Sequence, residues 1–243
     1  MTLETIDIIN GILLLLILAI SIFVGIKIIT KYFKNNDKVY LFAGTFWILL
    51  VCPWYAHSTA FIVALLTGKG ISPELYFILG NVFIPIGIVI WLVVFTELCY
   101  KDKQKIIIGI YFVYAIAFYI FFFYALSSSS TLSLIGELQG EMEVQYSRIV
   151  VVYYLTVLLT LLISGIIFGL QSMKSENLEV KLRGKLLIVA FLSYVIGIFI
   201  DSILDHNVIS LILIRILEIS SVIEFYAAFI MPKWIKKLFL KQK

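Results

Sequence analysis

Charged side chains are scarce in this sequence. Asp, Glu, Lys and Arg together make up 14% of its 243 residues, whereas 62% of the residues are apolar. Soluble globular proteins carry about 25% charged residues, and disordered chains combine low hydrophobicity with high charge. Because the composition departs from both patterns, with a mean hydropathy of +1.08, a soluble domain and a disordered chain are both excluded.

Cysteine and histidine are almost absent as well. The only cysteines are Cys52 and Cys99, and the only histidines are His57 and His206. This supply excludes a disulfide framework and a zinc cluster built from these residues. The first ten residues, MTLETIDIIN, lack the positive charge that a signal peptide needs, so we expect the first apolar run to be retained as a membrane anchor.

Long apolar runs dominate what is present. A membrane-spanning helix needs about 20 predominantly apolar residues, and the runs show no period-two alternation of the kind that barrel strands require. We therefore expect an all-α membrane protein that forms one bundle of seven transmembrane helices; six spans plus a long hairpin is the alternative, because the turn before the last run is short. The expected helices are roughly 8–29, 39–66, 74–99, 106–126, 148–171, 186–204 and 209–231.

The basic residues predict the orientation of the bundle, because cytoplasmic loops are enriched in Lys and Arg. Alternate connections are basic, and the other set contains only Lys69 and Arg148. We therefore expect a multi-pass protein of the plasma membrane with its N-terminus outside and its C-terminus inside. Its basic face would meet the lipid bilayer, not a nucleic acid. The basic set is Lys27, Lys31, Lys34, Lys38, Lys101, Lys103, Lys105, Lys174, Lys181, Arg183, Lys185, Lys233, Lys236, Lys237, Lys241 and Lys243.

The longest connection, 127–147, lies on the expected outer side. Its serines, glycines and glutamates are typical of a flexible connector. Its apolar residues also allow a partial lid, with a short amphipathic turn packed against the bundle. These apolar residues are Leu132, Leu134, Ile135 and Leu138.

Ionisable residues inside a bilayer are costly and are candidates for function. A rise of 1.5 Å per residue places five polar residues from four expected helices in one layer of the outer half. We expect this layer to form a small cavity, and we take all five as candidate ligand-binding residues. They are His57, Asn81, Asp201, Arg215 and Glu218.

Pairing within this layer is expected because an unpaired buried guanidinium is costly. We predict that Arg215 pairs with Asp201 first and Glu218 second, and that His57 bonds to Asn81 or Glu218. Three interpretations stay open: the network only clips helices together, it lines a ligand pocket, or it belongs to an ion or proton path.

Two prolines and two glycines bear on helix packing. Pro53 and Pro85 interrupt the second and third expected helices and can widen a cavity or act as hinges. Gly165 and Gly169 make a groove that we assign to packing within the monomer. A homo-oligomer is left open.

Missing motifs exclude several functions. No span has a lysine near its middle, so a retinal Schiff base is excluded, and no second membrane histidine can pair with His57 to hold a bis-histidine haem. A histidine-rich zinc site and the Gly-x-Gly-Asp of aspartyl intramembrane proteases are also missing. We therefore expect no enzymatic activity and no cofactor.

The final helix and its exit, RILEISSVIEFYAAFIMPKWIKK (215–237), place a polar helix before Pro232 and a basic inner segment. With the N-terminus outside and short inner loops, this layout resembles the seven-helix receptor and rhodopsin-like plan. It is also similar to the membrane sensor regions of histidine kinases. The resemblance implies a receptor or sensor that signals through a cytoplasmic effector protein on the basic face.

Two classes of function follow. A receptor or sensor would bind a small polar or cationic ligand from outside in the polar layer. A small-molecule or ion transporter or channel would need polar residues through the inner half as well, where only Glu97 and Glu224 stand with a few hydroxyl groups. The sequence favours the one-sided cavity of the receptor.

Overall fold

The computed structural model describes residues 3–204 and 207–240, and the fold in this part of the chain is almost entirely helical. The expected all-α class is confirmed, with one small hairpin added. The helices are α1 (Thr5–Asn35), α2 (Lys38–Leu50), α3 (Cys52–Thr67), α4 (Pro73–Asn81), α5 (Ile84–Cys99), α6 (Gln104–Leu126), α7 (Arg148–Met173), α8 (Leu178–Ile203), α9 (Val208–Ile230) and α10 (Lys233–Phe239). Two 3₁₀ turns (Lys101–Lys103 and Leu132–Leu134) and two strands, β1 (Gly136–Gln139) and β2 (Glu143–Tyr146), complete the described elements.

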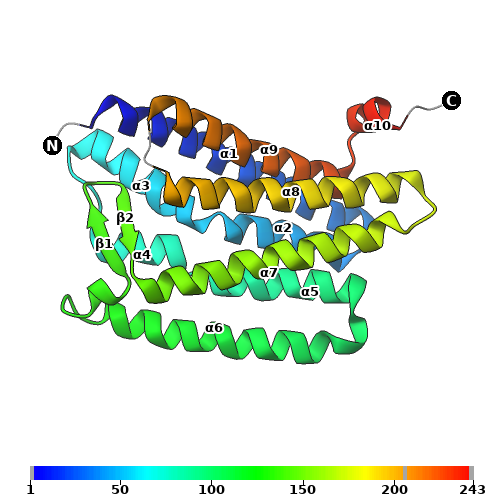
Figure 1. Cartoon of the computed structure of the whole chain (residues 1–243), viewed down its shortest axis with the longest axis horizontal. Coiled ribbons are helices and arrows are strands. Elements are labelled where there is room, and N and C mark those ends of the chain that lie inside the picture. Colours follow the sequence, from blue (N-terminus) through cyan, green and yellow to red (C-terminus); the bar gives the residue numbers. More distant parts are fainter. Residues whose placement is uncertain (1–2, 205–206, 241–243) are drawn as a thin grey trace.

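The long helices run side by side along one axis (Figure 1). Helix α1 packs against α2 and α9, α2 against α5, α5 against α7, and α7 against α8, which returns to α9. These contacts close a ring, and α6 packs outside the ring against α5. The N-terminus and the β1–β2 hairpin lie at one end, called the hairpin end below, and α10 lies at the opposite end, called the basic end (Figure 1).

Five helical segments are long and apolar enough to cross a membrane, and α2 with α3 makes a sixth if that bent pair is one span. Helix α9 corresponds to the last expected run, 209–231, and has 23 residues. It differs from the others because its charged residues, Arg215, Glu218 and Glu224, lie along the middle of the helix and not near its ends. The structure thus gives a protein with five or six candidate spans; the seventh depends on whether this charged helix crosses too.

Two of the expected continuous helices are broken near the hairpin end. The axes of α2 and α3 differ by 46° across Val51. Pro53 and Pro85 each occupy the second position of the helix that begins after a break. A proline lacks the N–H that would continue the helical ladder. The expectation of interrupted helices is therefore confirmed.

Neighbouring side chains satisfy carbonyl groups at the break between α4 and α5. Tyr119 donates to the carbonyl of Val82 at 2.7 Å. Cys52 donates to the carbonyl of Gly80 at 3.0 Å. Because lipid offers no hydrogen bonds, a broken membrane helix needs such partners, and here the partners come from α6 and α3.

Glycines allow two helix crossings to close tightly. A Cβ atom on Gly44 would lie 2.5 Å from the carbonyl oxygen of Gly25, and one on Gly184 would lie 2.5 Å from that of Gly169. A Cβ on Gly165 would meet the ring of Phe191 on α8. The expected use of Gly165 and Gly169 for packing within the monomer is confirmed.

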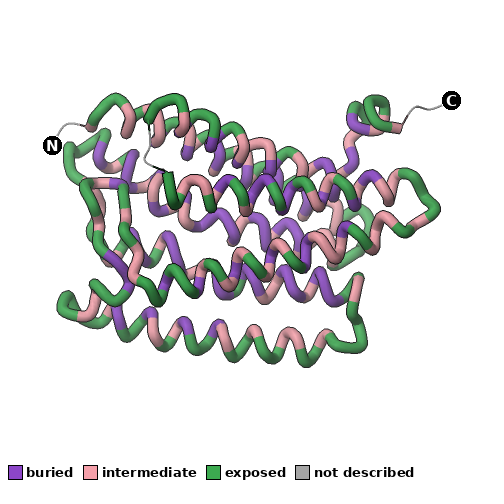
Figure 2. Tube along the Cα trace, viewed as in Figure 1, coloured by how far each residue is buried: buried purple, intermediate pink, exposed green. Residues whose placement is uncertain are grey.

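The centre of the ring is filled by aromatic side chains that are almost fully buried. Trp47 stacks on Phe225 with ring centroids 4.1 Å apart, and Trp91 packs on Phe46 and Phe191 at 5.0 and 4.8 Å. Trp91 also donates to the hydroxyl of Ser164 at 2.7 Å. Figure 2 shows the buried residues on the inward faces of the ring and the more exposed surface of α6. We call this core the aromatic layer.

Candidate functional site

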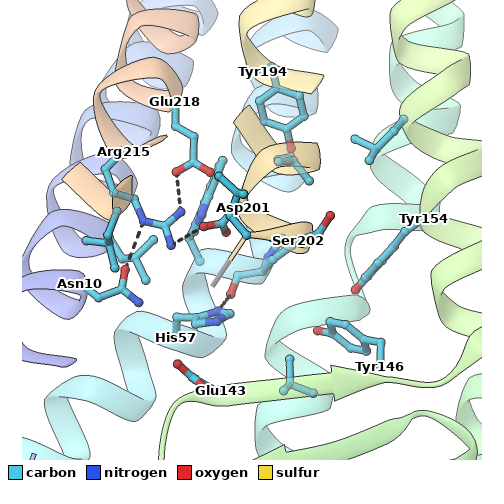
Figure 3. A pocket seen from close by; sticks show the side chains of 18 of the residues that line it. Asn10, His57, Glu143, Tyr146, Tyr154, Tyr194, Asp201, Ser202, Arg215 and Glu218 are labelled. Atoms are coloured by element: carbon cyan, nitrogen blue, oxygen red, sulfur yellow. Dashed lines mark hydrogen bonds and ion pairs between the residues drawn. The ribbon is translucent and has the colours of Figure 1, made fainter. Parts of the chain in front are cut away.

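Arg215 on α9 makes three polar contacts near the hairpin end. Its Nη2 lies 3.0 Å from Asp201 Oδ1 on α8, its Nη1 donates to Glu218 Oε2 at 2.9 Å, and its Nε donates to Asn10 Oδ1 on α1 at 3.1 Å. The predicted pairing with both acids is confirmed, while the contact with Asn10 was not expected. The cluster therefore joins the first helix to the last two long helices (Figure 3).

Close packing of α8 on α9 brings the acids to the guanidinium. A Cβ atom on Gly197 would lie only 3.1 Å from Glu218 Cγ, so this glycine gives the Glu218 side chain its room. Arg215 is 3% exposed and Glu218 is 1% exposed. At that burial each charge depends on the other, because removing one partner of a buried pair costs about 3–5 kcal/mol. Asp205, one turn beyond Asp201, lies outside the described residues.

His57 on α3 contacts a tyrosine instead of the partners expected for it. Its Nδ1 lies 2.9 Å from the carbonyl oxygen of Pro53, and its two ring nitrogens lie 3.0 and 3.1 Å from the hydroxyl of Tyr76 on α4. Tyr76 in turn donates to the carbonyl of Met142 at 2.9 Å. The expected bond to Asn81 or Glu218 is thus replaced by contacts that connect α3, α4 and the hairpin.

Asn81 lies behind the wall of the site. Its Nδ2 donates to the Phe77 carbonyl at 2.8 Å, and its Oδ1 accepts from the Tyr154 hydroxyl at 2.5 Å. Asn81 is fully buried, and Tyr154, which lies over it, lines the cavity instead. The expectation that Asn81 lines the cavity is therefore wrong: its amide donates to its own helix and accepts from Tyr154, so its effect on a ligand would act through that tyrosine.

A cavity of about 670 Å³ opens inside the ring at the hairpin end. Small-molecule sites usually have volumes of about 300–1,000 Å³. Helices α1, α3, α7, α8 and α9, the end of α2, the start of α5 and strand β2 all contribute to its wall. The polar residues that line it are Asp7, Asn10, His57, Glu143, Gln145, Tyr146, Tyr154, Tyr194, Asp201, Ser202, Arg215 and Glu218. We call it the hairpin-end cavity.

Negative charge exceeds positive charge in this wall. Among the described residues, Asp7, Glu143, Asp201 and Glu218 line the cavity, and Arg215 is the only Lys or Arg in the lining. A cleft lined by one sign of charge concentrates ions of the other sign. Burial raises the pKa of Tyr146, on β2, to about 12, so its hydroxyl adds no charge near neutral pH. The wall therefore favours cations over anions.

The hairpin covers one side of the cavity. Strand β1 pairs antiparallel with β2, with Gly136 opposite Tyr146. Ile135, just before β1, and Met142, in the turn between the strands, are buried. Gly70 donates to the Glu141 side chain from the loop between α3 and α4. Of the two interpretations for the 127–147 segment, this folded hairpin agrees with the partial lid. The expected turn is a single 3₁₀ turn, Leu132–Leu134, and strands follow it.

A second, smaller cavity of about 410 Å³ lies at the basic end. Arg183 on its wall donates to the last carbonyls of α9, those of Ala228 and Phe229, at 3.0 and 2.8 Å. Glu179 pairs with Arg183 at 2.9 Å and with Lys236 of α10 at 2.5 Å. The contacts of Arg183 and Glu179 hold α10 against the basic end of α8 and α9. The aromatic layer lies between the two cavities.

The structure brings four of the five predicted residues to one cavity, and it adds residues that the sequence analysis missed. On α1 the sequence offered two signals that were not used, the acid Asp7 and Asn10, which is the only amide in the first apolar run. Glu143 and Tyr146 could not be found, because the hairpin that points them inward was not expected. Among the described residues no group of three or more His, Cys, Asp and Glu could hold a metal ion.

Fold and cavity together define the class: a helical, multi-pass type of membrane protein with a polar site inside its bundle. The chain matches no protein-family model, and no curated protein matches it in sequence. The function therefore has to be argued from the site itself.

Proposed function

We propose that this chain is a receptor or sensor of the plasma membrane that binds a small polar or cationic molecule in the hairpin-end cavity. In this proposal the N-terminus and hairpin face the outside, α9 is the seventh span, and the basic end meets a cytoplasmic effector protein. The observation that carries it is a ligand-sized cavity whose wall holds the Arg215 cluster. Intramembrane charges of this kind mark functional sites in membrane proteins.

Helix α9 supports the signalling half of the proposal because it reaches both ends. Near the cavity it holds Arg215 and Glu218, and its last carbonyls accept hydrogen bonds from Arg183 at the basic end. Through Glu179, Arg183 is connected to Lys236 of α10. A ligand that shifts α9 at the cavity would therefore change the contacts of α10, which is the surface offered to a partner.

Ligand binding is tested by thermal unfolding of the purified protein in detergent during a screen of small molecules. A bound ligand raises the unfolding temperature because it stabilises the folded state. Two matched variants locate the binding site. Ile198→Trp places a large ring in the cavity, whereas Ile196→Trp lies on the same helix at a position that is 46% exposed. We expect Ile198→Trp to abolish the stabilisation and Ile196→Trp to keep it. A hit that stabilises both variants equally would contradict binding in this cavity.

A transporter is the second candidate, and the cavity at the basic end is the observation that favours it. Two cavities at opposite ends of one ring are what a carrier needs on its two sides. The aromatic layer between them, with Trp47 and Phe225 stacked, supports the receptor because buried rings fill the space between the two cavities. Flux of a stabilising ligand into liposomes separates the two: a receptor gives binding without flux, and a transporter gives both.

A further inference from the structure

Glu218 has one oxygen that the cluster does not use. Oε2 accepts from Arg215, but Oε1 is buried and has no hydrogen-bond partner among the described residues. Buried acceptors without a partner are rare in native proteins and call for an explanation. Glu218 lies in the cavity wall, so a molecule that enters the cavity can supply the missing donor.

The charges around Glu218 determine whether a positively charged, neutral or negatively charged ligand group fits best beside it. Arg215 offers little to an anion because each of its three nitrogens already contacts Glu218, Asp201 or Asn10. Those contacts leave the net negative charge of the wall in place. A protonated amine fits best, since a hydrogen bond between a charged donor and a carboxylate is about twice as strong as a neutral one.

The remainder of the wall decides what the amine carries. The residues that face the cluster across the cavity are mostly apolar or aromatic, and Figure 3 shows Tyr146 and Tyr154 on that side, away from Arg215 and Glu218. The apolar part of the lining is Ile6, Leu14, Leu50, Pro53, Trp54, Ile84, Val144, Val151, Val157, Leu158, Ile198, Leu204 and Leu211. Such a wall suits an apolar body, and the aromatic rings also attract a cation.

We propose that the hairpin-end cavity is a site for an organic amine: one ammonium group donates to Glu218 Oε1, and an apolar body packs against the wall formed by α3 and α7. This inference rests on the proposed function, because it names the ligand class of the same cavity. A divalent metal ion does not fit, since the described residues contain no group of three metal ligands. A carboxylate does not fit either, since it would meet Asp201, Glu143 and Glu218 with no free guanidinium.

Three probes that differ in their polar group test the charge on the unaltered protein. They are 2-phenylethylamine, 2-phenylethanol and 3-phenylpropanoate, and binding is followed by thermal unfolding and calorimetry in detergent. We expect the amine to bind at least about tenfold more tightly than the alcohol, as loss of a charge-assisted hydrogen bond predicts, and the carboxylate not to bind. Equal binding of amine and alcohol would overturn the amine site but keep the cavity as a binding site. Binding of none of the three would overturn both.

A pair of variants tests the residue. Glu218→Gln removes the charge, whereas Glu224→Gln removes a carboxyl from the same helix outside the cavity wall. We expect Glu218→Gln to weaken 2-phenylethylamine at least about tenfold and to leave 2-phenylethanol unchanged, and Glu224→Gln to change neither. Amine binding that survives Glu218→Gln overturns the inference. If Glu218→Gln does not fold, the three-probe comparison on the unaltered protein decides.

Discussion

The guanidinium of Arg215 and the side-chain amide of Asn10, 205 residues apart in the chain, connect α9 to α1. Arg215 Nε donates to Asn10 Oδ1 at 3.1 Å, while the two acids engage the other nitrogens. This contact joins α1 to α9 and helps close the ring. Without it, the buried Nε of Arg215 would lose its hydrogen-bond acceptor on α1.

The ion pair between Arg215 and Asp201 is predicted to show strong coupling. Arg215→Ala should lower the stability in detergent by about 3–5 kcal/mol, because it leaves buried carboxylates without their partner. Asp201→Asn should reduce the loss that Arg215→Ala causes, since one of those charges is then gone. The measurement is a double-mutant cycle of unfolding free energies, with an expected coupling of about 0.5–3 kcal/mol. Strictly additive losses would refute direct contact. The exposed pair Glu97–Lys101 is the control, for which no measurable coupling is expected.

Tyr76 is predicted to hold the hairpin on the bundle. Its hydroxyl contacts His57 and donates to Met142, so Tyr76→Phe should cost about 1 kcal/mol and loosen the hairpin locally. Hydrogen exchange of the backbone amides in β2 should speed up, with little change in α7. Tyr124→Phe, at a side chain that is 61% exposed, serves as the control. Unchanged exchange in β2 would show that other contacts hold the hairpin.

Glycine crossings are predicted to be intolerant of a single methyl group. Gly184→Ala places a Cβ 2.5 Å from the backbone oxygen of Gly169, which cannot move away as a flexible side chain could. A loss of about 1–3 kcal/mol is expected from such overpacking. Gly109→Ala on α6 meets nothing within 4 Å and should be neutral or slightly stabilising. Equal unfolding temperatures for the two variants would argue against close packing of α7 on α8.

The orientation of the bundle is predicted to follow the basic residues. In a background without the native cysteines, Ser129→Cys at the hairpin end should react with an impermeant reagent in intact cells. Leu178→Cys at the basic end should react only after the membrane is opened. Both positions are exposed, unlike Ile135, which directly precedes β1 and is buried. Labelling of Leu178→Cys from outside would show that the bundle has the opposite orientation.

Much of the fold could be predicted from the sequence because hydrophobic length and charge placement act locally. The breaks at Pro53 and Pro85 follow from the missing N–H of proline, and the partners of Arg215 follow from depth and the cost of an unpaired charge. The partner of Asn10 and the position of Asn81 behind Tyr154 depend on how distant helices rotate about their axes. Apolar runs that are hydrophobic on all sides carry little information on rotation. The hairpin was missed because its strands have only four residues each, so the polar–apolar alternation of Glu143–Tyr146 is too short to stand out.

The central claim, an acidic cavity that opens at the hairpin end, is tested most directly by the reactivity of a cysteine in its wall. Ile198→Cys and Ile196→Cys, the latter at an exposed position outside the cavity, are made in a background without Cys52 and Cys99. Both are treated in intact cells with methanethiosulfonate reagents, one cationic and one anionic. We predict that only Ile198→Cys reacts, and that the cationic reagent is faster by about tenfold or more, as electrostatic focusing by the acidic wall requires. Failure of Ile198→Cys to react in intact and in opened cells, or equal rates for the two reagents, would contradict the account.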